Sequence, residues 1–211
     1  MNRSIALLFS VVCHPLLLPS YLFYVVCYEL PGVVRYPLPA NRWQLTCLVA
    51  LFTFVLPSVG TALLLWRGLI TGSMELPERR QRPLPFLLAT LSFGAATLLL
   101  NSMPEAVDAL LRYMLLGMTL AVLLTLLVSL RWKISAHGVG VGGAVGLMMV
   151  LYVRDTSTGF PIGWLLASIL LAGVVLSARL ALNAHTPAQA WAGFSLGISL
   201  VLGLGVGSAL T

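Results

Sequence analysis

The feature that most constrains this chain is a series of long apolar runs, which are 15 to 24 residues in length. A helix rises about 1.5 Å per residue, so runs near this length match a hydrocarbon core about 30 Å thick. Strands are shorter, and barrel strands alternate apolar with polar residues. Of the 211 residues, 59% are apolar and 9% are charged, which leaves too little polar surface for a water-soluble globule. We predict an all-α, polytopic transmembrane helical bundle.

Seven apolar segments are predicted to form one integral membrane domain over residues 1–211. The first is interrupted by His14-Pro15, and we interpret it as an uncleaved first span. The third and fifth are short, so six to seven membrane segments are expected, with a half-crossing among the possibilities. The segments are residues 5–28, 45–66, 84–100, 109–130, 139–153, 162–180 and 188–210.

The connections between these segments are expected to alternate between two faces of the bundle. The face of the N-terminus would carry residues 67–83, 131–137 and 181–187, and the opposite face residues 29–42, 101–108 and 154–161. This alternation would place the most basic connections at one end of the bundle, together with His137 and His185. Glycines repeat every fourth residue at 138, 142 and 146, at 193 and 197, and at 203 and 207, which predicts close helix packing nearby.

Three charged stretches on this face could hold a phosphate. They are residues 75–83 (ELPERRQRP), residues 131–138 (RWKISAHG), and Arg179 followed by the residues up to Gln189. Alone, the first stretch is typical of a positive-inside loop. Together they supply guanidinium and ammonium groups, helix N-termini and two imidazoles, which are the groups needed to bind a phosphate ester and cleave it.

The order and spacing of these stretches resemble the motifs of the type 2 phosphatidic acid phosphatase superfamily. Its motifs are Lys, six residues, Arg-Pro; Pro-Ser-Gly-His; and Ser-Arg, five residues, His, three residues, Asp. Arg82-Pro83 matches the end of the first motif, and Ser135-Ala136-His137 matches the second with Ala for Gly. Arg179 and His185 keep the interval of the third. The resemblance covers about residues 75–193.

The chain departs from these motifs at several positions. Glu75 stands where the first motif has its lysine, so Arg79 or Arg80 would supply that charge. Ile134 replaces the proline of the second motif, and Ala178 replaces the serine of the third, with Ser177 one position early.

Gln189 occupies the aspartate position of the third motif. A glutamine oxygen can accept a hydrogen bond from imidazole but cannot offer a full negative charge, for which Glu75 or Glu78 would be substitutes. The residues Thr186-Pro187-Ala188-Gln189 also read as a capping box. We expect the Gln189 side chain either to cap the helix or to orient His185, but not both, because a helix capped at Thr186 leaves His185 outside it.

The resemblance implies a metal-independent lipid phosphatase that needs no cofactor. His185 would attack phosphorus, His137 would protonate the departing alkoxide, and Gln189 would orient the nucleophile. The predicted phosphate-binding residues are Arg82, Lys133, Ser135 and Arg179, with Arg79 or Arg80. His14 matches no motif, and we interpret it as structural or substrate-lining.

The expected substrate is a lipid phosphate, with polyprenyl diphosphate, phosphatidic acid and phosphatidylglycerol phosphate as candidates that the sequence does not separate. The expected location is a bacterial inner membrane, as a multi-pass protein surrounded by lipids. Eight basic residues lie on the site face and four on the other. When the predicted phosphate ligands Arg82, Lys133 and Arg179 are left out, the counts are five and four, so the positive-inside rule decides little. Because members of the resembling family commonly act on the outer face, we favour the periplasmic side.

Two other classes of function remain open. A non-catalytic anionic-lipid carrier or scramblase-like protein is favoured by Gln189 and Glu75. A purely structural membrane subunit would leave the clustered histidines unexplained. A nucleic-acid partner is not expected, because the net charge of +6 reflects few acids rather than a dense basic face. The sequence leaves the oligomeric state open, and Cys13, Cys27 and Cys47 are expected to be small buried apolar residues.

Overall fold

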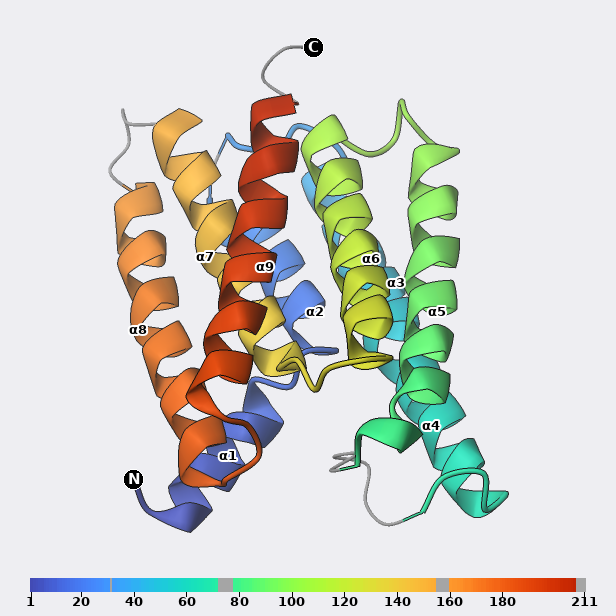
Figure 1. Cartoon of the computed structure of the whole chain (residues 1–211). Helices are drawn as coiled ribbons and strands as arrows, with labels where there is room; N and C mark the ends of the chain where they lie inside the picture. Colours follow the sequence, from blue (N-terminus) through green and yellow to red (C-terminus); the bar gives the residue numbers. More distant parts are fainter. Residues whose placement is uncertain (31, 72–77, 155–159, 208–211) are drawn as a thin grey trace. The chain divides into compact units, whose positions relative to one another are not determined.

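The chain divides into two helical units. The computed structural model describes residues 1–30, 32–71, 78–154 and 160–207 (Figure 1). Unit 1 comprises residues 1–18 and 134–211, and unit 2 comprises residues 19–133. Within the described residues, six helices, three in each unit, are long and apolar enough to cross a membrane. The predicted all-α, polytopic transmembrane fold is therefore confirmed, while a single domain over the whole chain stays a prediction.

The first apolar segment is broken rather than a single span. It contains α1 (Arg3–Val12), α2 (Leu18–Tyr24) and a π-helical turn, Val25–Glu29. Pro15 lacks the N–H that would continue α1 and disfavours helical backbone at His14. The interruption expected at His14-Pro15 is therefore present, and α1 and α2, at 10 and 7 residues, are each too short to cross a bilayer alone.

The third and fifth segments, by contrast, are long enough to cross a membrane. They lie in α5 (Pro83–Asn101) and α7 (Ala136–Arg154), each of 19 residues. Their polar and glycine-rich ends were left out of the apolar runs, which made them look short in the sequence.

Unit 2 contains three long helical stretches. α3 (Arg42–Ala50), a π turn (Leu51–Val55) and α4 (Leu56–Trp66) make one continuous stretch, followed by α5 and by α6 (Ala109–Ser129). Short 3-10 turns lie at Pro39–Asn41 and Arg79–Gln81. α5 and α6 form an antiparallel pair (Figure 1).

Hydroxyl groups join the long helices of unit 2. The side chains of Thr97 on α5 and Thr119 on α6 lie 2.7 Å apart, and Ser92 donates to the carbonyl of Phe52 at 2.5 Å. In apolar surroundings each such bond satisfies a polar group that water does not reach.

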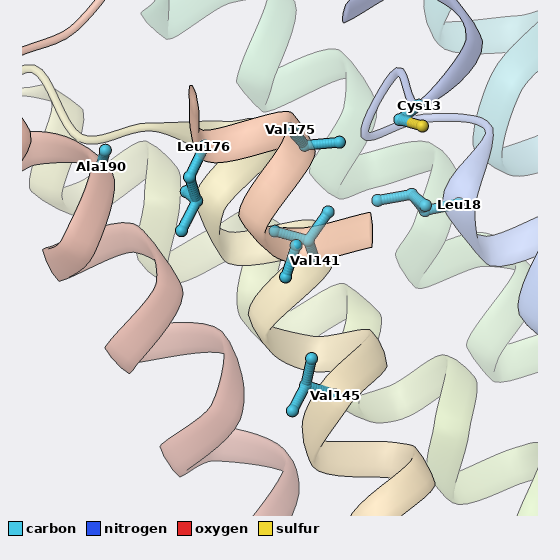
Figure 2. Packing of buried hydrophobic residues seen from close by; sticks show 8 residues of the cluster. Cys13, Leu18, Val141, Val145, Val175, Leu176 and Ala190 are labelled. Atoms are coloured by element: carbon cyan, nitrogen blue, oxygen red, sulfur yellow. The ribbon is translucent and has the colours of Figure 1, made fainter. Parts of the chain in front are cut away.

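Unit 1 is built on the parallel helices α7 and α9 (Pro187–Gly207), with α8 (Phe160–Ala181) packed beside α7 and α1 packed against α8. Its apolar core joins the end of α1 to α7 and α8. Figure 2 shows Cys13 and Leu18 near Val141 of α7 and Val175 of α8. This core holds the C-terminal end of α1 against two long helices.

Glycines allow α7 and α9 to touch backbone to backbone. A Cβ atom on Gly138 would lie 2.6 Å from the carbonyl oxygen of Ala190, and one on Gly142 would overlap that of Phe194. The close packing predicted from residues 138–146, 193 and 197 is thus confirmed. Gly203 is an exception, because a Cβ atom there would meet nothing within 4 Å.

The cysteines follow the prediction only in part. Cys13 and Cys27 are buried, but Cys47 is exposed on α3. The expectation of a buried Cys47 is wrong, because its position on the helix turns it away from the interior of the chain.

Candidate functional site

A tight turn between α8 and α9 places His185. Asn183 has a left-handed backbone with φ of 52°, which asparagine tolerates better than most residues. The N–H of Asn183 donates to the carbonyl of Leu180 at 2.9 Å, and that of Ala184 donates to the carbonyl of Arg179 at 3.1 Å. This paired pattern is the Schellman motif, and it closes the chain so that His185 follows the last turn of α8 directly.

The start of α9 is a capping box that also holds His185. The N–H of Gln189 donates to Thr186 Oγ1 at 3.3 Å, and the N–H of Thr186 donates to Gln189 Oε1 at 3.2 Å. His185 Nδ1 lies 3.2 Å from the same Oε1. The prediction that capping and histidine orientation exclude each other is therefore wrong, since one amide oxygen serves both.

This arrangement fixes the tautomer of His185. The backbone N–H of Thr186 can only donate, so the amide atom that faces it is an oxygen, and an oxygen of an amide can only accept. The proton in the bond to Gln189 therefore sits on Nδ1 of His185. In the neutral ring the lone pair is then on Nε2, which is the form a nucleophilic histidine needs.

The start of α7 lies beside the start of α9. Ser135 caps α7, because its Oγ accepts from the N–H of Gly138 at 3.1 Å. The N–H of Ser135 donates to the backbone carbonyl of Gln189 at 3.3 Å, and a Cβ atom on Gly193 would overlap the Ser135 carbonyl. The structure thus brings residues 135–137 and residues 185–189 to one end of unit 1.

His137 is buried in this end of unit 1 and is held by α1. Its Nε2 lies 2.9 Å from the backbone carbonyl oxygen of Ser10. A carbonyl only accepts, so Nε2 carries a proton, and the lone pair of the neutral ring is on Nδ1. His137 also lies within electrostatic reach of Arg179, His14 and His185. The two imidazoles predicted to act together therefore belong to one local charge environment.

Arg179 brings a buried positive charge to the same end. Its side chain is only 5% exposed, and its Nη1 donates to Ser10 Oγ at 3.1 Å. It lies in the last turn of α8, where the helix dipole favours a cation. The sequence of unit 1 contains one acidic side chain, Asp155, which follows Arg154 and lies outside the described residues. The residues that unit 1 contributes therefore favour an anionic ligand at this end.

Ser10 and the position of His14 were missed by the motif reasoning. The His14 ring lies edge-on to that of His137, with centroids 5.7 Å apart, and its Nδ1 accepts from the N–H of Leu16 at 3.3 Å. The available signal was the presence of two polar residues four positions apart in an apolar segment, where polar side chains are costly. No motif pointed to Ser10.

The remaining predicted phosphate ligands belong to unit 2. Arg82 is buried directly before α5, and Arg80 is exposed. Arg79 donates to the carbonyl of Leu130, which follows the last turn of α6. Lys133 is half-buried at the end of unit 2. The convergence of these four cations on the histidines stays a prediction.

The two acids offered as substitutes for the missing aspartate stay a prediction. Glu78 accepts a hydrogen bond from Gln81 within unit 2, at 3.2 Å. Glu75 lies outside the described residues.

The described part of the chain holds no group of three or more His, Cys, Asp or Glu side chains arranged to bind a metal ion. Comparison with protein-family models, curated proteins and solved structures gave no match.

Proposed function

We propose that this end of unit 1 is the reaction centre of a membrane lipid-phosphate phosphatase that works through a phosphohistidine. One observation carries the proposal: His185 is held by Gln189 with Nδ1 as donor, which puts the lone pair of the neutral ring on Nε2, the atom proposed as the nucleophile. A second histidine and a buried arginine belong to the same end of unit 1. The resemblance to the type 2 phosphatidic acid phosphatase superfamily includes His137, Arg179 and His185 among its motif positions.

The proposed reaction has two steps. In the first, the Nε2 lone pair of His185 forms a bond to phosphorus while the bond from phosphorus to the lipid oxygen breaks, and protonated His137 gives that oxygen a proton. In the second, water attacks phosphorus, the bond from phosphorus to nitrogen breaks, and neutral His137 takes the proton from the water. Arg179 balances the charge of the phosphoryl oxygens, with Arg82, Lys133 and Arg79 or Arg80 as further proposed ligands, and Ser135 as a donor.

Gln189 sets a limit on this chemistry. Its oxygen orients His185, but it carries no charge to stabilise the positive ring that forms when His185 is phosphorylated. Its hydrogen bond to the ring is also shared with the helix cap. We therefore expect slower turnover than an aspartate at this position would support.

A lipid substrate is favoured by the surroundings of the site. The long helices that carry it are apolar enough to lie in a bilayer, so that an acyl or prenyl chain can remain in hydrocarbon while its head group reaches Arg179. Polyprenyl diphosphate, phosphatidic acid and phosphatidylglycerol phosphate remain the proposed candidates. We place the protein in a bacterial inner membrane, with the site on the periplasmic side.

Phosphate release from these three lipids, by purified protein in detergent with EDTA, tests the proposal. Wild type should release phosphate and, with radioactive substrate, should retain acid-labile label on His185. His185→Ala should abolish both signals, and His137→Ala should slow labelling by alkyl esters. Unchanged turnover in His185→Ala would eliminate the proposed nucleophile.

A non-catalytic anionic-lipid carrier is the second candidate, because Gln189 is neutral and takes part in the helix cap. A carrier would bind the same lipids and shield them from an added phosphatase. It would form no acid-labile phosphoenzyme, so the labelling experiment separates the two functions.

A further inference from the structure

The break after α1 leaves one backbone carbonyl available to a side chain. In a continuous helix the N–H of His14 would bond to the carbonyl of Ser10. Here it donates to the carbonyl of Val11 at 3.2 Å, and Pro15 prevents the helix from continuing. The Ser10 carbonyl accepts the ring of His137 instead, at 2.9 Å.

The side chain of the same residue meets the buried arginine. Arginine has no acceptor atoms, so Ser10 Oγ accepts the hydrogen bond from Arg179 Nη1, at 3.1 Å. Ser10 is itself 4% exposed. One residue of α1 therefore contacts the histidine of α7 through its backbone and the arginine of α8 through its hydroxyl.

We propose that Ser10 is a positioning residue that orients both the phosphate-binding Arg179 and the proton-transferring His137. This inference rests on the proposed function, since it assigns Ser10 to the same site. It adds that His137 gives its proton from Nδ1, because Nε2 is engaged by the Ser10 carbonyl. The proton moves from Nδ1 to the departing lipid oxygen, and Nε2 keeps its own proton and its bond to Ser10 throughout.

The contribution of the hydroxyl is tested by a pair of nearly isosteric variants. Ser10→Thr keeps the oxygen that Arg179 contacts, whereas Ser10→Val replaces it with a methyl group of similar volume. Loss of one hydrogen bond to a phosphate-binding group should raise KM for the lipid and the Kd for inorganic phosphate by about 3- to 10-fold in Ser10→Val. Because the bond is present before and during the reaction, kcat should change less than twofold. Ser10→Thr should match wild type in both constants.

Ser4 offers a control on the same helix, because it is exposed and its side chain accepts none of these bonds. Ser4→Val should leave KM, kcat and phosphate binding unchanged. Equal phosphate affinity in Ser10→Val and Ser10→Thr would overturn the proposed role of the hydroxyl. An equal rise in KM for the Ser4 and Ser10 variants would do the same, because it would reflect a general change in α1.

The tautomer of His137 is tested separately by nitrogen NMR of wild-type protein labelled at histidine, with His137→Gln used to assign its signals. At a pH where the ring is neutral, its proton is expected on Nε2, and a neutral ring with its proton on Nδ1 would overturn the assignment of proton transfer.

The phosphate-binding measurement separates failure of this inference from failure of the proposed function. If wild type hydrolyses none of the lipids but binds inorganic phosphate more tightly than Ser10→Val, the phosphatase proposal fails and the role of Ser10 in orienting Arg179 stands. If wild type binds no phosphate, the role of Ser10 fails as well.

Discussion

The double use of the Gln189 amide oxygen leads to a prediction that separates helix capping from histidine orientation. Gln189→Leu removes the acceptor for both the Thr186 N–H and His185 Nδ1. Loss of a capping interaction costs about 1 kcal/mol of folding free energy. Loss of a neutral hydrogen bond to the imidazole costs about 0.5–1.5 kcal/mol, which would lower kcat by about 2- to 13-fold at 1.36 kcal/mol per tenfold.

Thr186→Ala is the matched control for this substitution. It removes the other half of the capping box, the bond from the Gln189 N–H to Thr186 Oγ1, and leaves the contact between Gln189 and His185 in place. We expect a similar loss of stability, about 1 kcal/mol, with kcat within twofold of wild type. Thermal unfolding in detergent gives the stability, and phosphate release from the best lipid of the panel gives kcat.

Gln189→Glu completes the series. The carboxylate keeps the geometry of the acceptor and adds a negative charge beside the ring that becomes positive in the proposed phosphohistidine. Hydrogen bonds to charged groups contribute about 1 kcal/mol more than neutral ones, so kcat should rise about fivefold. The reasoning is refuted if Gln189→Leu retains wild-type kcat, or if Thr186→Ala lowers kcat as far as Gln189→Leu does.

Three further predictions concern the packing that supports the two units. Gly142→Ala should destabilise unit 1 by about 2 kcal/mol or more, because its Cβ atom would overlap the backbone of Phe194, whereas Gly203→Ala should be tolerated. Thermal unfolding compares the two variants, and equal melting temperatures would contradict the backbone contact. Asn183→Gly should be neutral or slightly stabilising, and Asn183→Val should lower the free energy of unfolding by about 1–2 kcal/mol, because the backbone at this position is left-handed. Denaturant unfolding measures both variants and would show the opposite order if the turn were absent. Asp108→Ala should destabilise unit 2 by about 1 kcal/mol and Asp108→Asn by less, because Asp108 accepts hydrogen bonds from the N–H groups of Arg35 and Tyr36. Hydrogen exchange at these two amides measures the loss, and unchanged protection in Asp108→Ala would contradict the prediction.

The sequence predicts the helical class of this chain because membrane spans can be recognised from their amino-acid composition. Long apolar runs allow few folds, so all six long helices could be located from hydropathy alone. The boundaries were harder to predict. α7 begins at Ala136 and includes His137 and several glycines, which dilute hydropathy but pack against α9.

The candidate site was predictable where local chemistry determines it. Thr186 and Gln189 have the residue types and the spacing of a capping box, and the structure forms one. That the same oxygen also accepts from His185 was not predictable. It depends on the turn at Asn183, whose left-handed backbone brings the imidazole back over the first turn of α9.

The part that sequence reasoning could not reach lies in α1, and the reason is physical. Motif comparison finds side chains, whereas His137 is held by a backbone carbonyl that any residue at position 10 could offer. What makes that carbonyl available is Pro15, five residues away, because it ends the helix and shifts the hydrogen bond of His14 to Val11. If this account is right, Pro15→Ala should let the His14 N–H compete for the Ser10 carbonyl. The hydrogen bond from His137 to the Ser10 carbonyl should then weaken, although no residue of the three motifs has changed. A histidine nitrogen spectrum identical to that of wild type would show that the availability of this carbonyl does not depend on the helix break.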